Sequence, residues 1–203
     1  EEKEILLREL HHRVKNNLAL IKGILTLQAE KYTGETCGDL IDDFKNRVDA
    51  LASLHKTLYN KNNLDKVNLV NYIEELCSSL SQTFEDGPTS VQIHLSLQEY
   101  DTEITKAVPL GLIINEVITN SFKHAFENRT IGTINVSLLS NNGSAILTIQ
   151  DDGKGFKLNN DSKSMGVNLI KDLSEQIDSN YKFEQNNGTK FTLTLSSSNQ
   201  SNN

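Results

Sequence analysis

The chain of 203 residues contains no tryptophan, only two cysteines and no long run of apolar side chains. Cys37 and Cys77 lie far apart and have no metal-ligating neighbours, so we expect free thiols in a reducing compartment. No apolar stretch approaches the roughly 18 residues that a membrane-spanning helix needs. With a net charge of −7 and no Lys/Arg-rich run, the sequence argues against nucleic acid as the main partner.

The first residues carry neither a signal peptide nor a helix start signal. Residues 1–4 are charged and helix-forming. We therefore expect a helix cut out of a longer one, with an upstream sensor region missing from this sequence. The expected location is cytoplasmic, without membrane contact in this segment.

Two amphipathic helices are predicted in the first part of the chain. Apolar residues recur every three or four positions from residue 1 to about 31, and again from about 39 to 59. A turn at 33–38 would fold the two helices into an antiparallel hairpin. Each helix would still expose apolar surface, so we predict that two hairpins pair into a four-helix bundle and that the protein is a homodimer.

Beyond the polar segment 60–63 the pattern changes to mixed α and β. Asn68 suits the N-cap of a helix over 69–84. Pro109 suits the first turn of a helix that runs to about Phe126. The predicted strands span 91–95, 134–139, 145–149, 181–185 and 189–195, with Asn142-Gly143 as a hairpin turn, a loop over 153–165 and a last helix over 166–177.

One predicted helix carries polar residues suited to a metal and phosphates. Four of them recur at three- and four-residue spacing, so a helix places them on one face. A carboxylate, an amide, an ammonium and an imidazole there could engage Mg²⁺ and phosphates, although a solvated helix face would show the same pattern. These residues are Glu116, Asn120, Lys123 and His124.

Glycines and a carboxylate at the predicted strand ends form the rest of the pattern. A strand runs into Asp151-x-Gly153-x-Gly155, where the glycines let the backbone approach a ligand and the carboxylate can accept from an adenine amino group. Gly166 stands at a helix start, where free N–H groups favour phosphate, and Thr189 begins the last strand. A surface turn and a simple helix cap are the alternative readings of the two glycine segments.

The order and spacing of these segments resemble the N, G1, G2 and final Gly-Thr boxes of the GHKL superfamily, which includes gyrase and the histidine kinases. The run from His11 to Leu18, His-His-Arg-Val-Lys-Asn-Asn-Leu, resembles the phosphoacceptor box of sensor histidine kinases close to the HWE-type subgroup. The resemblance covers about residues 5 to 196. It implies an α+β chain with a dimerisation and phosphotransfer hairpin over 1–62, a GHKL (Bergerat) α/β sandwich over 63–196 and a disordered tail over 197–203.

The resemblance also implies ATP and Mg²⁺ as ligands. Asn120 would be the metal ligand, and Glu116 would orient water near the γ-phosphate or tune the metal's surroundings. Lys123 and His124 would touch phosphate or ribose. Residues 157–165 would form the lid over ATP, which is short here and has one glycine where many histidine kinases have two or three.

The remaining site residues would surround the base. By resemblance, Asp151 would read adenine, while Gly153 and Gly155 would shape the pocket. Gly166 belongs to the G2 box beside the phosphates, and Thr189 would support the pocket from the last strand.

Two adjacent histidines are candidates for the phosphoacceptor. With the apolar stripe of the helix buried, His12 points roughly 160° from the centre of that stripe and His11 only about 60°. An acceptor must be reached by another domain, so His12 is the expected site and His11 the second choice. Asn16 stands where related kinases carry a polar residue that positions water for dephosphorylation. Arg13 replaces a common acidic neighbour and could steady the transferring phosphate.

The function that the resemblance implies is autophosphorylation on a helix histidine, followed by relay to an aspartate on a response regulator receiver domain. A GHKL ATPase without phosphohistidine chemistry is one alternative, although it would not need two histidines on the outside of a hairpin. A pseudokinase dimer scaffold is another, although the intact set of Glu116, Asn120, Asp151 and Gly155 argues against it.

Overall fold

The computed structural model describes residues 66–87, 89–141, 143–155, 165–185 and 187–195. The chain divides into two compact units, residues 1–48 and 49–203, and every described residue belongs to the second unit. The predicted hairpin and the tail therefore lie outside the described residues, as do both candidate phosphoacceptor histidines.

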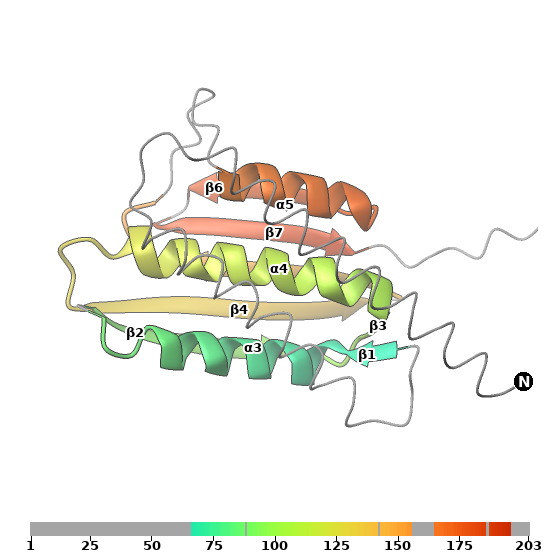
Figure 1. Cartoon of the computed structure of the whole chain (residues 1–203), viewed down its shortest axis with the longest axis horizontal. Helices are drawn as coiled ribbons and strands as arrows, with labels where there is room; N and C mark the ends of the chain where they lie inside the picture. The colour runs from blue at the N-terminus through green and yellow to red at the C-terminus, as the bar shows by residue number, and fades with distance from the viewer. Residues whose placement is uncertain (1–65, 88, 142, 156–164, 186, 196–203) are drawn as a thin grey trace, which may run out of the picture. The chain divides into compact units, whose positions relative to one another are not determined.

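A five-stranded sheet and the helices over one of its faces make up the described unit, as Figure 1 shows. The sheet order is β2-β4-β5-β7-β6; β2 and β4 run parallel, and the other neighbouring pairs are antiparallel. Buried and exposed residues alternate along β4, which is the pattern of a sheet with one covered face. The strands are β2 (Ser90–Leu97), β4 (Ile131–Asn141), β5 (Ser144–Asp151), β6 (Asn180–Gln185) and β7 (Thr189–Leu195).

All five predicted strands are therefore confirmed, with β2, β4 and β5 longer than expected. The hairpin between them turns at Gly143, whose φ of 81° suits glycine. Helix α5 (Met165–Gln176) confirms the last predicted helix. The loop expected over 153–165 lies largely outside the described residues.

Helix α3 (Leu69–Thr83) confirms the expected cap and the expected apolar face. The side chain of Asn68 accepts a hydrogen bond from the backbone N–H of Asn71 at 3.0 Å. The buried side of α3 faces the core and includes Tyr72 and Leu76, which are almost fully buried. Two short strands that the sequence did not predict, β1 (Lys66–Asn68) and β3 (Asp101–Glu103), pair antiparallel beside this helix start.

Helix α4 (Ile104–Asn120) begins earlier than predicted, so the placement of Pro109 in its first turn was wrong. Pro109 is buried inside the helix, where it cannot donate to the carbonyl four residues back. Most residues of the helix pack in the core, and this burial offsets the missing hydrogen bond. It ends in a π-helical turn, η1 (Ser121–Ala125), close to the predicted end at Phe126.

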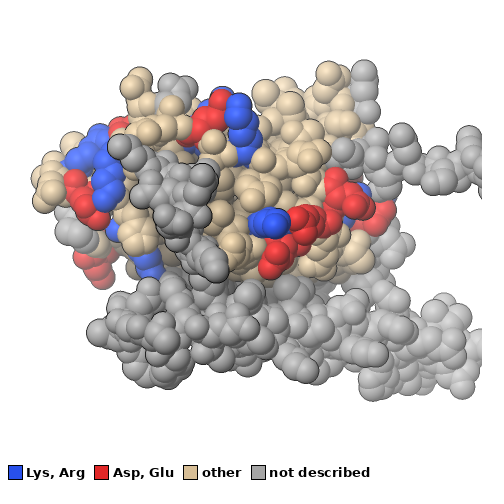
Figure 2. All heavy atoms as spheres, turned by 90° about the horizontal axis from the view of Figure 1, so that it is seen from above, with Lys and Arg blue, Asp and Glu red and all other residues tan. Residues whose placement is uncertain are grey.

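Charged side chains of both signs lie intermingled on the face of the molecule in Figure 2. Among the described residues, no helix is long and apolar enough to cross a membrane.

Candidate functional site

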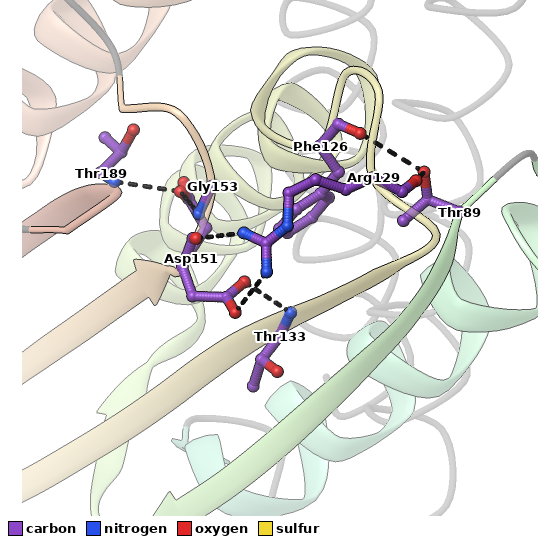
Figure 3. Close-up of polar contacts among 8 residues, drawn as sticks. Thr89, Phe126, Arg129, Thr133, Asp151, Gly153 and Thr189 are labelled. Carbon is purple, nitrogen blue, oxygen red and sulfur yellow. Dashed lines mark hydrogen bonds and ion pairs between the residues drawn. The ribbon is translucent and has the colours of Figure 1, made fainter.

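The polar centre of the described unit is Asp151, the last residue of β5, which is 2% exposed. Its Oδ1 accepts hydrogen bonds from the backbone N–H groups of Gly153 and Thr189, each at 3.0 Å (Figure 3). Its Oδ2 lies 3.1 Å from the hydroxyl of Ser121. A buried carboxylate needs such donors to offset its lost hydration. One side chain therefore joins the loop after β5, the start of β7 and the turn after α4.

Oδ2 of Asp151 is the less occupied of the two carboxylate oxygens. The Ser121 hydroxyl has one proton and also lies 3.3 Å from the backbone carbonyl of Val117, so its donation is shared between two acceptors. A carboxylate offers about four acceptor sites in all. Oδ2 consequently retains the capacity to accept from an amino group of a ligand.

Close contacts, and at Gly155 a positive φ, explain both glycines of the Asp-x-Gly-x-Gly turn. A Cβ on Gly153 would collide with the backbone carbonyl of Ala125 in η1. Gly155 has a φ of +79°, and a Cβ there would lie 2.7 Å from Nε2 of Gln185. On the other side, Gly188 has a φ of +125°, and a Cβ on it would run into the carbonyl of Asp151. The turn is therefore pressed between the end of α4 and the start of β7.

The start of α5 lies directly against the C-terminal part of α4. A Cβ on Gly166 would collide with Oε1 of Glu116, so a larger residue would force that carboxylate to move. The structure thus places the Asp-x-Gly-x-Gly turn against η1 and the start of α5 against α4.

The four polar residues predicted on one helix face do not all share an α-helical register. Glu116 and Asn120 lie one turn apart on α4 and are half-buried. Lys123 and His124 lie in η1, where the π-helical turn replaces the 3.6-residue period on which the prediction relied, and both are exposed. The expected face is therefore present for the first pair and is interrupted before the second.

Sequence reasoning missed the contacts that hold the glycine turn from outside. The guanidinium of Arg129 lies 3.0 Å from Oδ2 of Asp152 and also donates to the Asp152 carbonyl. The backbone N–H of Thr133 donates to Oδ1 of Asp152 at 2.8 Å. Desolvation raises the pKa of Asp152, but the hydrogen bonds from Thr133 and Arg129 and the charge of Arg129 outweigh it, so the pKa lies below its usual value. The sequence offered one signal for these contacts, the second acid Asp152 directly after Asp151, and we assigned it no role.

The fold and the site define a class. A sheet covered on one face by helices, with a polar helix against a glycine helix start and a buried aspartate at a strand end, is the arrangement that the GHKL resemblance predicted. The chain belongs to the histidine kinase-like ATPase domain family, whose model matches residues 89–195, more than half of the chain. A second model, described as histidine kinase, matches residues 9–84. It runs past the predicted boundary at 62/63 and includes α3, which contacts α4 of the ATPase domain, so that boundary stays a prediction.

Named relatives agree with this family. A blue-light-activated histidine kinase from Erythrobacter litoralis is 29% identical over 74% of this chain and 44% of its own length. The sensor histidine kinase PdtaS from Mycolicibacterium smegmatis is 26% identical over 84% of this chain and 35% of its own length. The chain thus spans less than half the length of these relatives.

Solved structures confirm the fold class. The histidine kinase domain of a blue-light activated histidine kinase from Erythrobacter litoralis superposes with a TM-score of 0.71 at 20% identity, over 90% of this chain and 84% of that one. Acinetobacter baumannii histidine kinase AdeS gives a TM-score of 0.55 at 14% identity, over 93% of this chain and 98% of that one.

Proposed function

We propose that this chain is the kinase core of a sensor histidine kinase. It binds ATP beside Asp151, transfers the γ-phosphoryl group to His12 and passes it to an aspartate of a response regulator receiver domain. The observation that carries the proposal is the convergence on the Asp151 carboxylate of three segments, which contribute Ser121, Gly153 and Thr189. This convergence offers a buried acceptor, which suits the amino group of a base.

In this proposal the adenine amino group donates to Oδ2 of Asp151. Gly153 and Gly155 keep side chains out of the space that the base approaches. The phosphates lie toward the first turn of α5, where unpaired N–H groups and the helix dipole favour anions, and Gly166 keeps that turn close to α4. Thr189 holds the Asp151 carboxylate from β7.

The residues on α4 suit Mg²⁺. Asn120 offers an amide oxygen and Glu116, one turn before it, a carboxylate. Among the described residues no three of His, Cys, Asp and Glu gather as a metal group. Asn120 and Glu116 suit a hard cation that takes one or two protein oxygens and completes its coordination shell with phosphate and water. Asn120 would hold the ion, which neutralises charge on the β- and γ-phosphates. Lys123 and His124 would contact phosphate or ribose.

The transfer step itself involves residues outside the described range. The unprotonated ring nitrogen of His12 attacks the γ-phosphorus, a nitrogen–phosphorus bond forms, and the bond to the bridging β,γ-oxygen breaks to release ADP. The imidazole then loses its remaining ring proton to water or to a nearby carboxylate. Arg13 would steady the transferring phosphate, and Asn16 would position water for dephosphorylation. His11 is the second candidate acceptor.

The partners in this proposal are a second copy of the chain and a receiver domain. Two hairpins would form a four-helix bundle with His12 on its outer surface, where both the ATP domain and the receiver aspartate can reach it. Phosphohistidine is labile, which suits relay better than storage. A cytoplasmic location would give the protein its ATP.

The test is to incubate the chain with γ-labelled ATP and Mg²⁺ and to examine the label on the protein. An acid-labile, base-stable label in the wild type, lost in Asp151→Asn, supports the proposal. Steady phosphate release without label on the protein would contradict it in favour of an ATPase. Failure to bind nucleotide at all would contradict it in favour of a dimer scaffold.

A further inference from the structure

Asp152 is held by four contacts to Thr133 and Arg129, although nothing in the proposed chemistry uses it. Its backbone N–H donates to the carbonyl of Thr133 at 3.1 Å, and its Oδ1 accepts from the N–H of Thr133 at 2.8 Å. Its Oδ2 pairs with Arg129 at 3.0 Å, and its carbonyl accepts a second hydrogen bond from the same guanidinium. The residue between the buried carboxylate and the first glycine of the turn is therefore held by one strand residue and one arginine.

Arg129 is itself held in place before it reaches Asp152. Its backbone N–H donates to the carbonyl of Phe126 at 3.0 Å, and its carbonyl accepts from the Thr89 hydroxyl at 2.7 Å. Its guanidinium lies 5.9 Å from the centre of the Phe126 ring, within the range of cation–π attraction. Figure 3 shows the side chain reaching from the loop before β4 toward the turn that contains Asp151.

We propose that Arg129 and Asp152 are positioning residues for adenine recognition. This inference rests on the proposed ATP site. The guanidinium holds the carbonyl of Asp152, which belongs to the same peptide unit as the Gly153 N–H that donates to Oδ1 of Asp151. The carbonyl of Thr133 holds the preceding peptide unit by accepting from the N–H of Asp152. Through the Gly153 N–H, Arg129 and Asp152 therefore orient the Asp151 carboxylate, and with it Oδ2, toward a base.

The exposure of the pair indicates that its role is orientation more than stability. The side chains of Arg129 and Asp152 are 39% and 45% exposed. Ion pairs at such exposure contribute little to folding. Two parallel contacts from a planar guanidinium nevertheless define an angle, which a single ammonium cannot do. Loss of the pair should therefore affect ligand selectivity more than melting temperature.

The experiment compares nucleotide binding in the full chain and in four variants. Arg129→Ala removes both contacts, Arg129→Lys leaves at most one, and Asp152→Asn keeps the carbonyl contact. Lys182→Ala is the matched control, because it removes an exposed ion pair with Glu184 on β6. Calorimetry gives the Kd for ATP and for GTP, thermal unfolding gives the melting temperature, and labelling at saturating ATP gives the transfer rate.

Arg129→Ala should weaken ATP binding by about fivefold or more. GTP binding should weaken less, because guanine presents a carbonyl where adenine presents the amino donor. The Kd for GTP divided by the Kd for ATP should therefore fall. Arg129→Lys and Asp152→Asn should lie between Arg129→Ala and the wild type, and Lys182→Ala should match the wild type. The transfer rate at saturation should not change.

A Kd for GTP divided by the Kd for ATP that is unchanged in Arg129→Ala would overturn the inference alone. If both affinities fell equally and the melting temperature also dropped strongly, the residue would be purely structural. A wild-type chain that binds no ATP would overturn the proposed function and this inference with it.

Discussion

The carboxylate of Asp151 and the backbone N–H of Thr189 meet at 3.0 Å, although 38 residues separate them in the chain. The contact ties the end of β5 to the start of β7, next to the last residues that pair in their ladder. Gly188 makes it possible, since any larger residue would collide with the Asp151 backbone. The carboxylate that would recognise the base is thus attached to the sheet, and its position does not depend on the loop that follows β5.

Asp151→Asn should abolish tight ATP binding without unfolding the protein. The amide oxygen can still accept from Gly153 and Thr189, and the amide nitrogen can donate to the Ser121 hydroxyl. That nitrogen cannot accept from adenine, so we expect a Kd for ATP at least about tenfold higher. Calorimetry with ATP measures the loss, and a melting curve serves as the control. Wild-type affinity in this variant would exclude Asp151 as the adenine acceptor.

Gly166→Ala should impair phosphoryl transfer, because the new methyl group would displace the Glu116 carboxylate. We expect the transfer rate at saturating ATP to fall by about tenfold or more, since misplacement by about an ångström is enough for such a loss. The measurement is single-turnover labelling, with Ser78→Ala on the exposed side of α3 as a control. An unchanged rate would show that the contact between α5 and Glu116 is dispensable.

The pH dependence of stability should reveal the Asp152 contacts. The pKa of Asp152 is lowered in the folded protein, so its contribution is present above the unfolded value near 4 and is lost as the pH falls through the folded value. At 45% exposure the contribution should be below about 1 kcal/mol. Melting temperatures of the wild type and Asp152→Asn should differ near pH 7 and converge as the pH falls below the unfolded value and through the folded one. A gap that stays constant across that range would contradict the assignment.

Cys77 should be inert toward thiol reagents in the folded protein. It is 3% exposed on α3, and burial raises the pKa of its thiol to about 12. At pH 8 only about one thiol in ten thousand would then be the reactive thiolate. In a Cys37→Ser background, labelling should occur only after denaturant is added. Rapid labelling of the native variant would indicate that α3 detaches readily.

Much of the ATPase domain could be predicted because its elements are long and periodic. The alternation in β4 and the cap at Asn68 are local signals, and both were confirmed. Strands β1 and β3 have three residues each, too few for a period to register. Pro109 was misplaced because the usual preference of proline for a first turn was overridden by burial of the helix around it.

The sequence indicated the single residues of the site but not the contacts that join its segments. An acid and glycines after a strand marked the turn at Asp151, and a glycine at a helix start marked Gly166, because glycine lets the backbone approach a ligand or a neighbouring element closely. The π-helical turn that separates Lys123 and His124 from the face of Asn120 leaves no mark in the spacing. The Arg129–Asp152 pair joins residues 23 positions apart through a fold-dependent contact, which no local pattern encodes.

The most direct test of the kinase proposal is to identify the phosphorylated residue. The full chain and the variants His11→Gln and His12→Gln would be incubated with γ-labelled ATP and Mg²⁺, and the label tested for acid and base stability. We predict an acid-labile, base-stable label in the wild type and in His11→Gln, and none in His12→Gln. Label that persists in His12→Gln would contradict the assignment of His12, and its loss in His11→Gln alone would move the acceptor to His11.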